Sequence, residues 1–233
     1  IPANDRFLLA TPQRLIASSL PAAFEHWQSK APGFSVDDED EIEEWAENND
    51  VGPLTAQLAF LCQEENIGEE LRANDSKYAE LRKALTQNWA IAPDEKLILF
   101  SSFRRTIDYL AKRLKADGVR IEKLHGSIPE DRQLVLDRFA EAKGPVVLLT
   151  SEVGGEGLDL QFCRRMINYD LPWNPMKVEQ RIGRIDRIGQ EAETIEIVNL
   201  ICENTIEAQV YERLYQRLGI IEQTLGSFET ILG

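Results

Sequence analysis

The spacing of hydrophobic residues divides the chain into two parts. Before residue 90, apolar side chains recur every three or four positions, which is typical of amphipathic helices. These positions are Leu15, Ile16, Leu20, Phe24, Trp27, Leu54, Leu58, Leu61, Tyr78, Leu81, Leu85 and Trp89. Pro21 lies inside the first pattern and predicts a kink or two shorter helices. Asn74-Asp75-Ser76 interrupts the last pattern, and we expect residues 1–90 to form a helical region.

From Lys96 onward, short continuous apolar runs alternate with amphipathic segments. The runs lie at 97–100, 146–149, 166–169 and 195–200, and a further strand is expected at 120–124. Helical stripes between them are formed by Ile107, Leu110, Ala111 and Leu114, and then by Val135, Leu136 and Phe139. Buried strands that alternate with helices predict a parallel sheet covered on both faces. The predicted fold class is α/β, with residues 91–233 as the sheet domain.

Composition fits a protein with a buried core. The 233 residues are 43% hydrophobic, and no apolar run approaches the roughly 18 residues of a membrane span. We therefore expect a cytoplasmic protein with no membrane partner. The three cysteines form no C-x-x-C pair, so they are expected to be reduced core thiols and no metal site is predicted. The chain begins at Ile1-Pro2 without an initiator Met and is expected to be part of a longer polypeptide.

The net charge of −14 argues against nucleic-acid binding, but the acidic residues are unevenly distributed. Residues 1–90 carry 17 acidic and 7 basic side chains, whereas residues 91–233 carry 23 and 19. The acidity is concentrated in the run Asp37–Glu44, within a predicted loop over residues 37–50. This run is either a solvated loop or an arm that docks on a basic partner.

Ligands of open α/β sheets bind beyond the carboxyl ends of the strands, so the residues that follow each strand are the first candidates. Ser102 and Arg104 follow the first strand, where hydroxyl and backbone N–H groups suit either a phosphate or a simple helix cap. His125 and Gly126 follow the second strand, and a turn would also explain them. Ser151 follows the third strand and begins a segment with three glycines in four positions, which allows a close backbone approach.

The most informative segment is Gln180 to Gln190. On a helix of about 100° per residue, Gln180, Arg184 and Arg187 fall within roughly 60°, while Ile182 and Ile185 lie opposite. We therefore predict one helix with an apolar back and two arginines that approach the same polyanion. A bare R-x-x-R pair is also typical of a solvated surface helix. The stiff segment before it contains Trp173, which is either a core aromatic or a residue of a nucleic-acid groove.

The string Q-x-x-x-R-x-x-R-I-G-Q resembles motif VI of the Snf2-type superfamily 2 helicase-like ATPases. The form S-E-x-G-x-E-G at residues 151–157 resembles motif V of the bacterial RNA-polymerase-associated Snf2-like ATPases. The resemblance covers most of the chain and is specific over residues 96–200. It implies a second RecA-like lobe, preceded by a helical protrusion, of an ATP-dependent translocase on double-stranded DNA. ATP and Mg²⁺ would be bound mainly on an N-terminal RecA-like lobe that this sequence lacks.

The resemblance also implies roles for individual residues. Arg184 and Arg187 would be catalytic, as arginine fingers that reach the γ-phosphate. The implied nucleotide-binding residues are Gly155, Glu156, Gly157, Asp159 and Gln180. The implied nucleic-acid-binding residues are Ser102, Arg104, His125, Gly126, Ser151 and Trp173. RNA polymerase or another nucleoprotein complex is the implied larger partner.

Two departures from the family pattern bear on these roles. No G-x-x-x-x-G-K-[ST] loop occurs in the chain, so the isolated chain is expected to be inactive as an ATPase. Ser151-Glu152-Val153 stands where motif V usually has Thr-Arg-Ala, which removes the phosphate contact attributed to that arginine. Two alternatives remain open at this point, namely a protein-docking scaffold and a strand-separating superfamily 2 DNA or RNA helicase.

Overall fold

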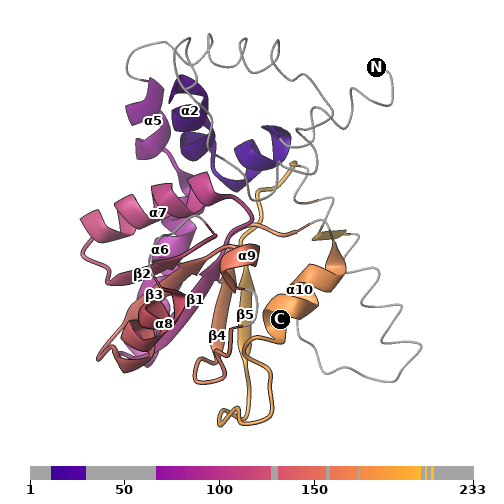
Figure 1. Cartoon of the computed structure of the whole chain (residues 1–233). Coiled ribbons are helices and arrows are strands. Elements are labelled where there is room, and N and C mark those ends of the chain that lie inside the picture. The colour runs from indigo at the N-terminus through magenta and orange to yellow at the C-terminus, as the bar shows by residue number, and fades with distance from the viewer. Residues whose placement is uncertain are drawn as a thin grey trace.

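The computed structural model of the chain describes residues 12–29, 67–126, 131–155, 158–172, 174–205, 208 and 211–212 (Figure 1). Its elements are α2 (Leu20–Ser29), α5 (Ile67–Ala73), α6 (Ser76–Ile91), β1 (Lys96–Phe100), α7 (Arg104–Ala116), β2 (Ile121–Leu124), α8 (Arg132–Glu141), β3 (Val146–Thr150), α9 (Glu152–Gly155), β4 (Arg165–Asn168), α10 (Pro175–Ile182) and β5 (Glu196–Asn199). Within the described ranges, no helix is long and apolar enough to cross a membrane. The acidic run Asp37–Glu44 and the positions Leu54, Leu58 and Leu61 lie outside the described residues.

Five parallel strands form one sheet in the order β2-β3-β1-β4-β5 (Figure 1). β1 is central, and its last residue Phe100 is in register with Thr150 of β3 and Asn168 of β4. β3 is buried at all five positions and β1 at four of its five. Strands covered on both faces need apolar side chains on both faces, which explains the continuous apolar runs. The predicted α/β fold class and all five predicted strands are confirmed.

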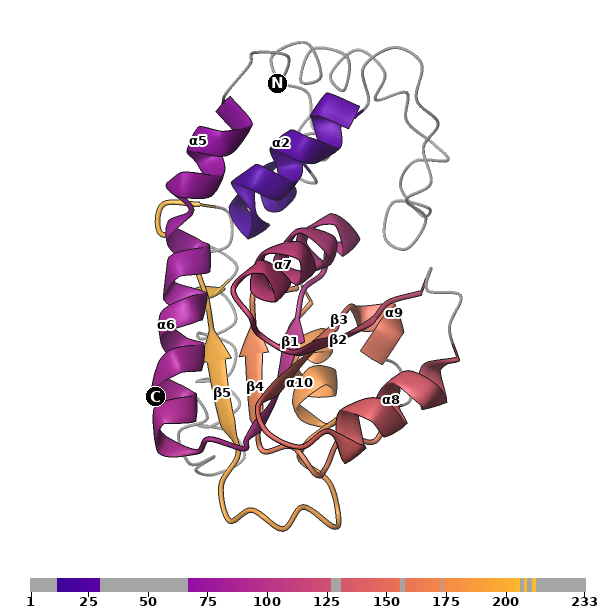
Figure 2. The same cartoon turned by 90° about the vertical axis from the view of Figure 1, so that its left-hand side faces the viewer.

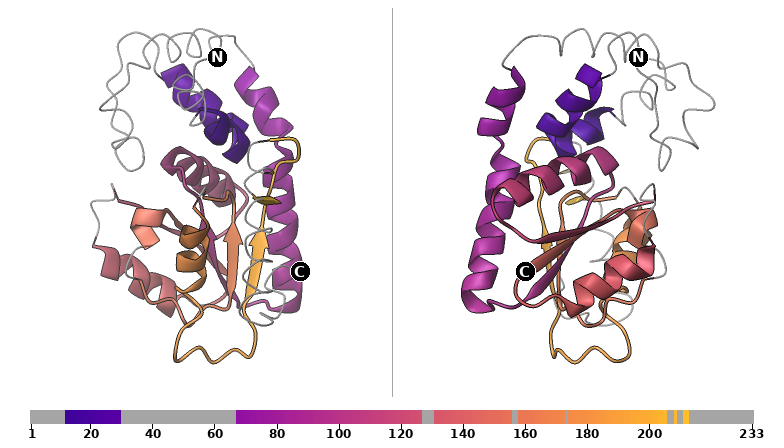
Figure 3. Two further views of the ribbon diagram at one scale, coloured as in Figure 1. Left: turned by 90° about the vertical axis from the view of Figure 1, so that its right-hand side faces the viewer. Right: turned by 60° about the vertical axis from the view of Figure 1, so that its left-hand side comes forward.

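Helices lie on both faces of the sheet (Figures 2 and 3), and a hydrophobic layer covers each face. Because successive side chains of a strand point to opposite faces, Leu97 and Leu99 of β1 pack in one layer and Ile98 and Phe100 in the other. The first layer is completed by α6 and α7, and the second by α8. Both predicted helical stripes therefore face the sheet.

The helical region contacts the sheet domain through α2 and α6. Residues 12–18 are helical, Ser19 interrupts them, and Pro21 lies in the first turn of α2, so the predicted interruption is confirmed. Ala22 joins the core layer of α6 and α7, whereas Phe24 and Trp27 pack in a separate cluster with residues of α5. The helical region and the sheet thus share part of one core.

Asp75 begins α6 and explains the break in the pattern at residues 74–76. Its side chain accepts a hydrogen bond from the backbone N–H of Tyr78 at 3.0 Å, as a helix N-cap does. Its other oxygen accepts from the hydroxyl of Tyr109 on α7 at 2.6 Å. One carboxylate therefore caps α6 and joins it to α7.

Cys163 and Cys202 form no disulfide bond within the described part of the chain. Cys163 is buried in the α8 layer, and burial raises its pKa to about 12, so it is a protonated core thiol as predicted. Cys202 is half-buried and Cys62 lies outside the described residues.

Candidate functional site

The carboxyl ends of β1, β3 and β4 meet at one edge of the sheet. Pairing continues past the strands, since Ser101 N–H donates to the carbonyl of Thr150 at 3.1 Å and Tyr169 N–H to the carbonyl of Phe100 at 2.9 Å. The polar residues gathered at this edge are Ser101, Ser102, Ser151, Glu152, Asn168 and Asp170. All except Glu152 are buried. The edge is therefore a closed polar layer rather than an open cleft.

Asp170 is the centre of this polar layer and is 1% exposed. Its carboxylate accepts hydrogen bonds from the hydroxyl of Ser101 at 2.5 Å, the hydroxyl of Ser18 at 2.6 Å and the backbone N–H of Ser102 at 2.6 Å. Burial alone would raise its pKa, but Arg181, Lys77 and the two hydroxyls outweigh burial and lower it. Asp170 is therefore ionised and satisfied inside the protein.

Ser18 has one hydroxyl proton, which it gives to Asp170. The contact of 2.9 Å between Ser18 and Thr106 is consequently a bond that Thr106 of α7 donates. Lys77 of α6, also buried, donates to the carbonyl of Ala17 at 3.0 Å. These bonds fix the helical residues 12–18 against α6, α7 and the end of β4.

Arg181 of α10 is 1% exposed, and each of its five N–H groups has an acceptor. Nε donates to Glu152 at 2.8 Å, and Nη2 donates to the same carboxylate and to Ser102 Oγ at 3.3 Å. Nη1 donates to Asn168 Oδ1 at 2.8 Å and to the carbonyl of Asp170 at 2.9 Å. One guanidinium therefore ties α10 to the ends of β1, β3 and β4.

The glycine segment, residues 152–159, packs tightly where it leaves β3. A Cβ on Gly154 would lie 2.3 Å from the carbonyl oxygen of Leu124, and a Cβ on Gly155 would lie 2.9 Å from the ring of Phe100. Ser151 Oγ accepts from the N–H of Gly154 at 3.1 Å. These two glycines thus allow close packing of α9 on β2 and β1, since a side chain at either position would clash.

The prediction of one helix through Gln190 is wrong, because α10 ends at Ile182 with Gly183 as its C-cap. Arg184 and Arg187 lie beyond it, in the arginine turn that we define as residues 183–190. Backbone hydrogen bonds join the arginine turn to the end of α10. Arg184 N–H donates to the Arg181 carbonyl at 3.0 Å, and Asp186 N–H donates to the Ile182 carbonyl at 2.9 Å. The apolar spacing persists through the turn, which is why it looks helical in the sequence.

Three contacts fix the arginine turn on the sheet domain. Ile185 is fully buried in the α8 layer, and Leu160 N–H donates to the Arg184 carbonyl at 3.1 Å. The side-chain amide of Gln190 donates to the carbonyls of Cys163 at 2.9 Å and Ile185 at 3.0 Å. Gly189 has a φ of +104°, which few other residues adopt, and this turns the chain towards Gln190.

The arginine turn presents two cations. Arg184 is half-buried and Arg187 is exposed. Within the described residues, neither guanidinium has a hydrogen-bond or ion-pair partner, whereas every N–H of Arg181 has one. Unpaired guanidinium groups on a fixed backbone are suited to an external anion with several oxygens.

Comparison with known proteins places this site in a family. Residues 76–189 match the family Helicase_C, described as the helicase conserved C-terminal domain. The match extends from α6 into the arginine turn. The chain is 40% identical over 141 residues to an uncharacterized ATP-dependent helicase, YqhH, of Bacillus subtilis. It is 31% identical over 189 residues to the RNA polymerase-associated protein RapA of Pectobacterium atrosepticum. Over residues 76–189 the chain is thus similar to helicase C-terminal domains, and RapA is among the relatives that it resembles.

These matches cover 60% and 77% of this chain but 25% and 19% of the two relatives, so the chain spans about a quarter of their length or less. The fold resembles the crystal structure of the C-terminal part of the Fun30 ATPase domain, with a TM-score of 0.55 and 23% identity. That likeness covers 86% of this chain and 66% of the other. The helicase C-terminal domain therefore has the predicted RecA-like fold.

The residues predicted to bind nucleotide are spread around the glycine segment and α10. Gly155 is buried and its N–H donates to the carbonyl of Ser151 at 2.8 Å, so this N–H is already used. Asp159 and Gln180 are exposed. Glu156 and Gly157 lie outside the described residues.

The residues predicted to contact nucleic acid differ in exposure. Ser102 and Ser151 are 6% exposed, and the backbone N–H of each is used inside the helicase domain. Arg104 is partly exposed at the start of α7, and Gly126 is exposed. Trp173 lies outside the described residues. The accessible part of this predicted surface is thus formed by Arg104 and Gly126.

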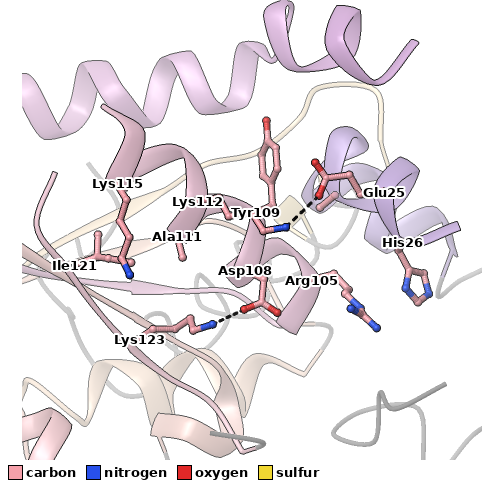
Figure 4. A pocket seen from close by; sticks show the side chains of 11 residues that line it. Glu25, His26, Arg105, Asp108, Tyr109, Ala111, Lys112, Lys115, Ile121 and Lys123 are labelled. Carbon is pink, nitrogen blue, oxygen red and sulfur yellow. Dashed lines mark hydrogen bonds and ion pairs between the residues drawn. The ribbon is translucent and has the colours of Figure 1, made fainter. Parts of the chain in front are cut away.

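His125 is buried at the end of β2, with Nε2 3.7 Å from a carboxylate oxygen of Asp108 on α7. Burial alone would raise the pKa of Asp108, but His125 and Lys123 outweigh burial and hold it well below its usual range. Lys123 is the closer partner, at 2.6 Å (Figure 4). Asp108 thus remains ionised and joins α7 to β2.

Sequence reasoning missed Arg181, Asp170 and Gln190. Arg181 has a sequence signal, because it lies about 100° from Gln180 and so towards the apolar side of α10. Its acceptors could not be predicted, since they come from separate segments of the chain. Glu152 could also have been singled out from the sequence, because the motif V that this segment resembles usually has an arginine at that position.

Proposed function

We propose that this chain is the second motor lobe of an ATP-dependent, Snf2-type translocase on double-stranded DNA. The observation that carries the proposal is the arginine turn, in which Arg184 and Arg187 have no partner among the described residues although the backbone around them is fixed. Guanidinium groups held in place without internal partners can stabilise charge that develops on a transferring phosphoryl group.

ATP with Mg²⁺ would be held mainly by an N-terminal lobe and would supply the phosphoanhydride that is cleaved. The described residues fit this division, because they offer cations at the arginine turn while the N–H groups of Gly154 and Gly155 are used internally. Arg184 and Arg187 would approach the γ-phosphate when the lobes close. Asp159 and Gln180, which are exposed, would contact the nucleotide from this lobe.

DNA would lie across the loops after β1 and β2, with phosphate contacts that do not depend on sequence. A pocket of about 390 Å³ between α2, α7 and β2 is lined in part by Arg105, Lys112, Lys115 and Lys123 (Figure 4). Lys112 pairs with Glu25 and Lys123 with Asp108, which reduces but does not cancel the positive charge. This surface is basic although the whole chain carries a net charge of −14.

The larger assembly on which the motor acts would be a nucleoprotein complex. RNA polymerase is one candidate, because the similar RapA protein is described as RNA polymerase-associated. The net charge of −14 favours a second candidate function, a docking scaffold without motor activity.

The test is ATP turnover by the full-length protein that carries this chain. Arg184→Ala and Arg187→Ala should each lower kcat by about 10³-fold and change the KM for ATP only a few-fold, because the contact forms in the transition state. Arg120→Ala, at an exposed arginine before β2, is the matched control and should retain full turnover. Equal loss of nucleotide affinity and turnover would contradict a finger role, and a wild-type protein without ATPase activity would favour the scaffold.

A further inference from the structure

The pair of Glu152 and Arg181 links two parts of the proposed site. Glu152 is the first residue of the glycine segment, and Arg181 lies one turn before Arg184. Arg181 uses two of its five N–H groups on the Glu152 carboxylate and three on Ser102, Asn168 and the carbonyl of Asp170. The guanidinium therefore bridges the start of the glycine segment and the ends of β1 and β4.

The charges of the pair are complementary, because the Glu152 carboxylate lies against the buried guanidinium of Arg181. An arginine at position 152 would face the buried guanidinium of Arg181, and two like charges inside a protein repel strongly. The carboxylate at position 152 and the guanidinium at position 181 are thus matched to each other.

The pair lies at the start of α9, since Glu152 is the first residue of that helix and its carboxylate accepts a hydrogen bond from Arg181. Gly154 is in close contact with the backbone at the end of β2, and Gly155 with the ring of Phe100. A shift of α9 would therefore displace the Glu152 carboxylate and, with it, Arg181. The carbonyl of Arg181 accepts the hydrogen bond from the N–H of Arg184 at 3.0 Å, so displacement of Arg181 displaces the start of the arginine turn.

We propose that the Glu152–Arg181 pair is a positioning device that couples α9 to the arginine turn, so that DNA bound across the loops after β1 and β2 changes how Arg184 and Arg187 meet ATP. This inference rests on the proposed function. It assigns to Glu152 and Arg181 a role in the response to DNA and no contact with the reacting atoms.

The decisive variant is Glu152→Gln. It retains the size of the side chain and one acceptor oxygen but removes the charge that holds the guanidinium. The Asp170 carboxylate also interacts with Arg181, so the buried cation keeps one counter-charge and the fold is retained. Arg181→Lys is the second variant, because a lysine has three donors and no planar fork and cannot satisfy the five bonds.

Turnover of the full-length protein is measured with and without saturating duplex DNA. In Glu152→Gln the DNA-stimulated rate should fall about 10-fold, whereas the basal rate and the KM for ATP stay within about two-fold of wild type. Arg181→Lys should show the same selective loss. The DNA-stimulated rate of the double variant should be no lower than that of either single variant, since both substitutions remove the same interaction. The control pair is Glu122→Gln and Arg138→Lys, an ion pair of 2.9 Å between β2 and α8.

Full DNA stimulation in Glu152→Gln would overturn the inference while leaving the proposed function intact. Equal loss of basal and stimulated rates, accompanied by a lower melting temperature, would reduce the pair to a packing role and also overturn it. A wild-type protein whose ATPase does not respond to DNA would overturn the proposed function, and this inference with it.

Discussion

The hydroxyl of Ser18 donates a 2.6 Å hydrogen bond to the carboxylate of Asp170, 152 positions further along the chain. Ser18 belongs to the helical region and Asp170 to the loop after β4, so this bond closes the polar layer at the carboxyl edge of the sheet. The same carboxylate accepts hydrogen bonds from the hydroxyl of Ser101 and the backbone N–H of Ser102. The backbone carbonyl of Asp170 accepts a hydrogen bond from the guanidinium of Arg181. Asp170 thus connects the helical region to α10.

We predict that Asp170→Asn destabilises the protein by about 3 kcal/mol or more, because it removes the counter-charge of a buried, hydrogen-bonded network. Urea unfolding at neutral pH measures the effect. Asp186→Asn, at an exposed aspartate of the arginine turn, is the matched control and should change stability by less than about 0.5 kcal/mol. A loss of similar size in both variants would contradict the central role of Asp170.

The pH dependence of stability should change in the same variant. The pKa of Asp170 is lower in the folded protein than in the unfolded chain, so ionised Asp170 stabilises the fold above the unfolded value of about 4. That stability is lost as the pH falls through the folded pKa. Asp170→Asn should therefore lose less stability than wild type on acidification below about pH 4, as measured by urea midpoints across a pH series. Parallel curves for the two proteins would show that the carboxylate does not titrate with folding.

We predict that Gly154→Ala destabilises the protein by about 2 kcal/mol or more, since its Cβ would lie 2.3 Å from a backbone carbonyl oxygen that cannot turn away. Gly183→Ala is the matched control. Its φ is −62° and the nearest atom to a Cβ would be 3.3 Å away, so the change should be within about 1 kcal/mol of neutral. Thermal melting of both variants measures this. Equal melting temperatures of the two variants would mean that α9 can move away from β2 with little loss of folding stability.

The strands were predictable because a strand buried on both faces needs a continuous apolar run, as 146–149 shows. The two ends of α10 were not equally predictable. Asn174 and Pro175 are ordinary start signals, and Asn174 does accept from the N–H of Met176 at 3.0 Å. The end of α10 at Ile182 was missed because a turn, rather than a helix, places Ile185 in the core. A spacing of three residues between buried positions suits both structures.

The polar contacts of the site were beyond the reach of sequence patterns. Arg181 bonds to residues 102, 152, 168 and 170, which only the order of the parallel strands brings together. Ser102 and Ser151 are likewise buried, although each lies just after a strand end. A residue type at a strand end predicts that it lies near the site, but its accessibility depends on distant segments.

The isolated 233-residue chain should hydrolyse ATP at well below about 1 s⁻¹, even with saturating duplex DNA, because it has the proposed finger arginines but no G-x-x-x-x-G-K-[ST] loop. Phosphate release by the purified chain measures this, and the full-length protein is the positive control. An isolated chain that turns over at ordinary enzymatic rates would rule out the two-lobe mechanism.

Removing the acidic run should strengthen DNA binding by the isolated chain. The seven acidic residues of Asp37–Glu44 oppose the attraction between phosphates and the basic residues of α7 and β2. Replacing them with Asn and Gln at constant length should tighten binding to a random duplex by about 10-fold at 50 mM salt. The difference should shrink at 200 mM salt as charges are screened. Fluorescence anisotropy on two unrelated duplexes provides the measurement, and Glu80→Gln with Glu141→Gln is the control for a general change in charge. A gain that persists at high salt, or that appears on only one duplex, would show that the run acts by occluding a specific site rather than by repelling phosphates.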